Sequence, residues 1–153
     1  MSVITVRDIA HVRYAAPDLS VMRSFLEDFG MQCFEASGRL YGKGTDGRPF
    51  FHVTEPGKAE FLAVGFIAKS VEDLEALAMH EGVAVEDSAE PGGGKILRLR
   101  DPDGYRIEVV AGQANGEQSF PLIGEVFNTP AAKPRLNREV RLTPGPSHPH
   151  RIG

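Results

Sequence analysis

The chain has 153 residues, of which 41% are hydrophobic and 25% are charged, and its net charge is -4. This composition is typical of one soluble domain with its own core, and the acidic balance excludes an extended nucleic-acid-binding surface. No apolar run approaches the roughly 18 residues of a membrane span, and the first residues lack the apolar core of a signal peptide. Cys33 is the single cysteine, so no internal disulfide can form, and we expect a cytoplasmic protein with no membrane partner.

Charge and proline content change near Gly112. Residues 1–111 carry 12 basic and 18 acidic side chains, whereas residues 112–153 carry 5 basic and 3 acidic side chains and six of the eleven prolines. Such a change in composition marks a domain boundary. We therefore expect a domain over residues 1–111 and a Pro-rich tail or interdomain linker over residues 112–153.

A repeat of 52 residues organises the expected domain. The segment HVRYAAPDLSVMRSFLEDFGM (11–31) aligns without a gap on AVGFIAKSVEDLEALAMHEGV (63–83). Each copy contains a strand, a capping residue, an amphipathic helix and a glycine that ends the helix. The capping residues are Asp18 and Ser70, and the glycines are Gly30 and Gly82.

Three further strands, separated by turn-rich segments, follow each helix. They are expected at residues 31–36, 39–43 and 49–54 in the first copy, and at residues 83–87, 95–100 and 105–111 in the second. The sequence thus predicts an α+β fold of two β-α-β-β-β modules, at about residues 8–55 and 59–111.

Three segments carry a resemblance to a known superfamily: IAHVRYAAPDL (9–19), FIAKSVEDLEAL (66–77) and LRDPDGYRIEVV (99–110). With the duplication, they resemble the vicinal-oxygen-chelate proteins, which include glyoxalase I, bleomycin-resistance proteins and type I extradiol dioxygenases. The resemblance covers residues 8–111. It implies paired β-α-β-β-β modules that form a curved mixed sheet around a cavity. A fold of this kind does not fix the chemistry.

The resemblance also implies up to four metal-ligand positions, one on the first and one on the last strand of each module. The first strands offer His11 and, at its repeat partner, Ala63. Alignment of FFHVT (50–54) with RIEVV (106–110) places His52 over Glu108 on the last strands. Alanine cannot bind a metal, so the trio that extradiol dioxygenases use, at the positions of His11, Ala63 and Glu108, is broken.

Two histidines and a carboxylate leave open positions on Fe(II), where a catechol and dioxygen can bind side by side. His11, His52 and Glu108 still offer that set, with Fe(II) or Mn(II) as the metal. The alternatives are structural roles. His11 is then a buried, hydrogen-bonded residue retained from a duplicated metal domain, Glu108 pairs with Arg98 or Arg106, and His52 faces solvent or the cavity.

The end of the chain favours one of three hypotheses. The segment HRIG (150–153) resembles the lead-in to another copy of the fold, as RDIA (7–10) leads into His11. By resemblance, the chain is then the non-catalytic N-terminal domain and linker of a two-domain extradiol dioxygenase that acts on a catechol-type aromatic. The metal belongs to the second domain, and that domain or a second copy of the chain is the partner.

Two alternatives stay open. One is a stand-alone metalloenzyme of the superfamily with His11, His52 and Glu108 as ligands. The other is a metal-free module that binds an aromatic or hydrophobic small molecule, as bleomycin-resistance proteins do.

Overall fold

The computed structural model describes residues 2–116, so most of the tail expected over residues 112–153 lies outside the described residues. The first module contains β1 (Val6–Ala16), α1 (Leu19–Asp28), β2 (Gln32–Ala36), β3 (Arg39–Lys43) and β4 (His52–Pro56). The second contains β5 (Glu60–Ala68), α2 (Val71–Glu81), β6 (Val85–Asp87), β7 (Lys95–Arg100) and β8 (Arg106–Ala111). The predicted pair of β-α-β-β-β modules and the α+β class are confirmed.

Both helices begin at the predicted capping residues. The Asp18 side chain accepts hydrogen bonds from the backbone N–H groups of Ser20 and Val21 at the start of α1. The Ser70 hydroxyl accepts one from Asp73 N–H at the start of α2, and Gly82 ends that helix with a φ of 68°. This left-handed conformation strains any residue with a Cβ, which explains the glycine. Neither described helix has the length and apolar character that crossing a membrane requires.

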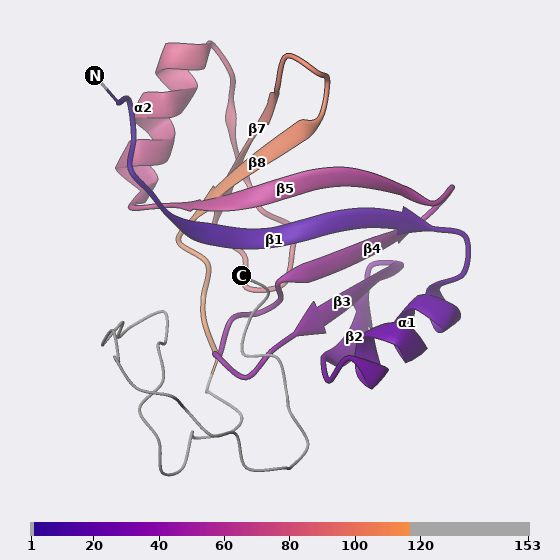
Figure 1. Ribbon diagram of the computed structural model, residues 1–153. Coiled ribbons are helices and arrows are strands. Elements are labelled where there is room, and N and C mark those ends of the chain that lie inside the picture. The colour runs from indigo at the N-terminus through magenta and orange to yellow at the C-terminus, as the bar shows by residue number, and fades with distance from the viewer. Residues whose placement is uncertain (1, 117–153) are drawn as a thin grey trace, which may run out of the picture.

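All eight strands form one mixed sheet in the order β2-β3-β4-β1-β5-β8-β7-β6. The first strand of each module pairs in parallel with the last strand of the same module, and β1 and β5 pair antiparallel at the centre. Figure 1 shows these two strands side by side through the middle of the molecule, with α1 and α2 near opposite ends of the pair. The modules are therefore related by a local two-fold axis.

The position of this axis follows from the strand register. Val12 and Val64, which the 52-residue repeat relates, are direct partners in the β1–β5 pair. On either side of them, His11 lies opposite Gly65 and Arg13 lies opposite Ala63. These two large polar side chains of β1 therefore each lie opposite a small residue of β5.

The two faces of the sheet differ in what covers them. One face, which we call the helix face, packs α1 on Leu40 and Phe51 and α2 on Leu97 and Val109. The other, which we call the inner face, carries His11, Arg13, Tyr41, Val53 and Glu108. Glu90, next to β6 at one edge of the sheet, bonds to Tyr41 of β3 near the other edge. The sheet is therefore curved, and its two halves face each other across the inner face.

Candidate functional site

His11 and Glu108 meet at the centre of the inner face. His11 Nε2 lies 2.7 Å from Glu108 Oε2, and the residues are 2% and 1% exposed. A carboxylate only accepts hydrogen bonds, so His11 Nε2 is the donor. The two residues come together because Gly65 stands between them in the sheet, paired with His11 on one side and with Glu108 on the other.

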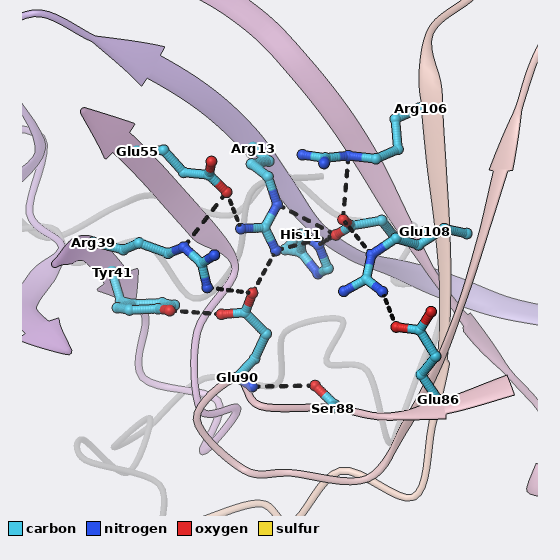
Figure 2. Close-up of polar contacts among 11 residues, drawn as sticks. His11, Arg13, Arg39, Tyr41, Glu55, Glu86, Ser88, Glu90, Arg106 and Glu108 are labelled. Carbon is cyan, nitrogen blue, oxygen red and sulfur yellow. Dashed lines mark hydrogen bonds and ion pairs between the residues drawn. The ribbon is translucent and has the colours of Figure 1, made fainter. Parts of the chain in front are cut away.

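The Arg13 guanidinium lies beside this pair and is 2% exposed. Its Nη2 donates to Glu108 Oε2 at 3.1 Å and to Glu90 Oε1 at 2.8 Å, and its Nη1 donates to Glu55 Oε1 at 2.8 Å. Figure 2 shows the three carboxylates converging on this one side chain from different segments. Burying a charge is costly unless it is paired, so Arg13 and its carboxylates depend on one another.

Glu90 extends this network across the curved sheet. It follows β6 and accepts a hydrogen bond from the Tyr41 hydroxyl at 2.6 Å. Arg39 Nη1 also approaches Glu90 Oε1, at 3.3 Å. Because Tyr41 and Arg39 belong to β3, the segment around Glu90 joins the second module to the first (Figure 2). Two buried nitrogens of this cluster, His11 Nδ1 and Arg106 Nε, have no hydrogen-bond partner among the described residues.

The pKa shifts follow from this arrangement. Burial alone would raise the pKa of Glu108, but the His11 hydrogen bond and the charge of Arg13 outweigh it and lower the pKa to about 2. Burial alone would lower the pKa of Arg13, but Glu108 and Glu90 raise it above its usual value. Burial and the bond to Glu90 raise the pKa of Tyr41 to about 12. At neutral pH the cluster therefore holds a guanidinium, carboxylates and a protonated phenol.

A family model describes residues 8–109 as part of the glyoxalase/bleomycin resistance protein/dioxygenase superfamily. The chain belongs to this superfamily. The match spans both modules, so the predicted membership is confirmed, although membership alone does not fix the chemistry. A comparison with curated protein sequences gave no match.

Solved structures of the superfamily share the fold. The Mn(II)-bound glyoxalase from Novosphingobium aromaticivorans superposes with a TM-score of 0.67 at 23% identity, over 78% of this chain and 44% of that one. A variant of homoprotocatechuate 2,3-dioxygenase from Brevibacterium fuscum superposes with a TM-score of 0.65 at 23% identity, over 75% of this chain and 35% of that one. The chain thus spans less than half the length of each.

His52 lies away from the His11–Glu108 pair. In β4, His52 pairs with Gly42 and Thr54 pairs with Leu40, which packs under α1. The His52 ring bonds to the Thr54 hydroxyl at 2.7 Å and stacks on Tyr14. Both contacts are on the helix face, so the expectation that His52 faces solvent or the cavity is wrong. Burial lowers the pKa of His52 to about 4, which keeps the ring neutral at pH 7.

The register explains this placement. In the second module, Glu108 of β8 pairs with Gly65 of β5. The 52-residue repeat relates Gly65 to Arg13 of β1, and Arg13 pairs with Val53 of β4. Val53, not His52, is therefore the counterpart of Glu108, and the sequence alignment of the last strands is off by one residue. Since side chains alternate between the faces of a strand, one residue is enough to move a side chain to the other face.

Ala63 occupies the remaining ligand position implied by the superfamily. It is fully buried and pairs with Arg13 on one side and with Arg106 on the other. Arginine, unlike histidine or glutamate, carries no free electron pair for a metal. The position of the missing ligand is thus flanked by two cations.

The residues present do not fit a three-ligand metal centre. His11 Nε2 is committed as a donor to Glu108, and Arg13 contacts the same carboxylate oxygen. Within residues 2–116, no group of three histidine, cysteine, aspartate or glutamate side chains is placed to hold a metal ion. A shared metal at His11, His52 and Glu108 stays a prediction from the sequence, and the structure brings together only two of the three residues.

Sequence reasoning found half of this cluster. The alternative expectation, that Glu108 pairs with Arg98 or Arg106, is borne out, because the Nε atoms of Arg106 and Arg98 lie 3.4 Å and 3.7 Å from Glu108 Oε1. Arg13 and Glu90 were missed. Arg13 had a detectable signal, since it is two residues after His11 in the same strand and must share its face. Glu90 follows a short strand in a turn-rich segment, and nothing local predicts its contacts.

One cavity lies apart from the residues at the centre of the cluster. It has a volume of about 580 Å³ and is bordered by the start of β1, the end of β8 and the segment before β4. Its walls include Phe50, Ile67 and Val110 together with Arg48. His11, Arg13 and Glu108 are not among the residues that line it.

Proposed function

We propose that this chain is a non-catalytic N-terminal domain of an extradiol dioxygenase-like protein that cleaves a catechol-type aromatic. In this proposal, a second domain of the same fold holds Fe(II) or Mn(II) and carries out the reaction. The chain's role is to fold as a stable module and to support the active domain.

The observation that carries the proposal is the Arg13 guanidinium at the centre of the inner face. A catalytic metal centre needs free ligands and open positions for the substrate. Here Glu108 is neutralised by Arg13, His11 donates to Glu108, and Ala63 supplies no ligand. The likeness to homoprotocatechuate 2,3-dioxygenase, of whose chain 35% is covered, is consistent with a domain that occupies part of a longer protein.

Two measurements test the proposal. The intact mass of the protein isolated from its source should be near twice the 16.6 kDa of this chain. The longer protein should consume dioxygen with a catechol and Fe(II) or Mn(II), whereas this chain alone should not. Dioxygen uptake by this chain that is lost in His11→Ala would refute the proposal, and so would an intact mass equal to that of this chain.

The 580 Å³ cavity supports a second candidate, a metal-free module that binds a small molecule. Its volume is within the range of ligand pockets, and its walls combine apolar side chains such as Phe50 with the charged Arg48. An aromatic ligand should raise the melting temperature in the presence of a chelator, and Phe50→Ala should abolish the shift. The absence of a shift across a broad panel of aromatic compounds would eliminate this candidate.

A further inference from the structure

The Arg13 side chain is positioned like a bound cation. Its Nη2 atom has Glu90 Oε1 at 2.8 Å and Glu108 Oε2 at 3.1 Å, and these oxygens come from segments on either side of it. His11 Nε2 lies 2.7 Å from the same Glu108 oxygen. Two atoms that bind one ion at about 2.1 Å lie roughly 3 Å apart when the bonds are at right angles. The Glu108 oxygen and the His11 imidazole are therefore spaced like neighbouring ligands of one ion, and Arg13 Nη2 lies within hydrogen-bond distance of both carboxylate oxygens.

We propose that the Arg13 guanidinium is the resident cation of this site and excludes a divalent metal from it. Within residues 2–116 no three histidine, cysteine, aspartate or glutamate side chains are placed to hold a metal ion. His11, Glu90 and Glu108 become candidate ligands only when the arginine, which supplies the positive charge there, is removed. In this role the arginine balances the buried carboxylates and keeps the two modules joined through Glu90. The inference concerns this buried cluster and is independent of whether a second domain follows.

The packing around Arg13 supports the proposal that its guanidinium takes the place of a metal ion. The small residues Ala63 and Gly65 of β5 lie opposite Arg13 and His11, and a Cβ added at Gly65 would lie 2.4 Å from the His11 ring. The inner face thus has room for both side chains of β1 only because β5 carries none of comparable size. A metal at the same place would have to displace a guanidinium that makes hydrogen bonds to three carboxylates.

Replacing Arg13 by alanine should turn the cluster into a metal site. The substitution removes the positive charge and leaves a space lined by the two carboxylates and the imidazole. We expect Arg13→Ala to bind about one Co(II) per chain, with visible absorption bands of a nitrogen- and oxygen-ligated ion. Wild-type protein and the charge-conserving Arg13→Lys should show no such bands.

Controls separate this site from other histidines. The double variants R13A/E108Q and R13A/H11A should lose the Co(II) bands. The quantity measured is therefore the amount of Co(II) bound by R13A minus the amount bound by each double variant. Arg48→Ala, which removes a guanidinium paired with Asp8 and Asp46 elsewhere, should gain none. This comparison also removes any contribution from His148 and His150, which lie outside the described residues.

The inference remains testable if R13A is poorly folded. The variant should then regain its far-ultraviolet circular dichroism and its melting transition when Co(II) or Mn(II) is added, because the ion replaces the lost charge. The inference would be overturned if neither Co(II) nor Mn(II) restored folding. It would also be overturned if R13A folded but bound no more Co(II) than R13A/E108Q. So would wild-type protein that binds one metal and loses it in His11→Ala.

Discussion

Gly65→Ala should destabilise the protein through His11. A Cβ at position 65 would lie 2.4 Å from Cε1, 2.6 Å from Nδ1 and 2.8 Å from Nε2 of the His11 ring, all closer than real contacts allow. The ring must move and lose its hydrogen bond to Glu108, at a cost of about 1.5–3 kcal/mol for a bond to a charged group. Gly65 does not have a positive φ, so alanine itself recovers about 0.4–1 kcal/mol. The expected net loss is about 1–2 kcal/mol.

The matched control is the same substitution in a His11→Ala background. Without the imidazole there is space for the new methyl group, and Gly65→Ala should be neutral or slightly stabilising. The coupling between the two positions should be about 2 kcal/mol in a double-mutant cycle. Urea unfolding followed by circular dichroism measures it, because the chain has no tryptophan. An equal cost of Gly65→Ala in both backgrounds would refute the placement of His11 over Gly65.

Three other outcomes follow from the structure. The pKa of Glu108 falls from 4.5 to about 2 on folding, so above pH 4.5 this carboxylate contributes up to about 3 kcal/mol to the free energy of unfolding, and the contribution is lost as the pH falls toward 2. Glu108→Gln should abolish this part of the dependence of stability on pH. An unchanged pH profile of unfolding in this variant would contradict the reasoning. The pKa of His52 falls from 6.5 to about 4, so its nitrogen NMR shifts should stay those of a neutral ring down to about pH 5. Asp18→Ala removes two backbone hydrogen bonds and one from the Ser20 hydroxyl in the first turn of α1. It should lower the free energy of unfolding in urea by about 1 kcal/mol, against no change for alanine at exposed Lys58.

The local elements were predictable because local chemistry fixes them. The capping bonds of Asp18 and Ser70 connect groups two or three residues apart, so the sequence places the helix starts without knowledge of the fold. The predicted strands 39–43 and 95–100 match β3 and β7 in full. The strand expected at residues 49–54 begins three residues later, at His52, because turn-like residues 44–51 precede it.

The candidate site was predictable only where one strand carries the information. His11 and Glu108 were found because the resemblance to the superfamily implies ligand positions on the first and last strands of each module. Their partner Arg13 shares a strand with His11, but its bonds to Glu90 and Glu55 cross 77 and 42 residues of sequence. Contacts of this kind depend on how the sheet curves, which no local pattern encodes.

The sequence by itself determined the duplicated β-α-β-β-β architecture, the helix ends, and the presence of a histidine on the first strand of the first module and a glutamate on the last strand of the second. The tertiary structure alone decided which residues meet. Pairing of β1 with β4 put Val53 on the inner face and His52 on the helix face, because side chains alternate and a shift of one residue reverses the face. Curvature of the sheet brought Glu90 to Arg13, and a buried charge there requires such a partner.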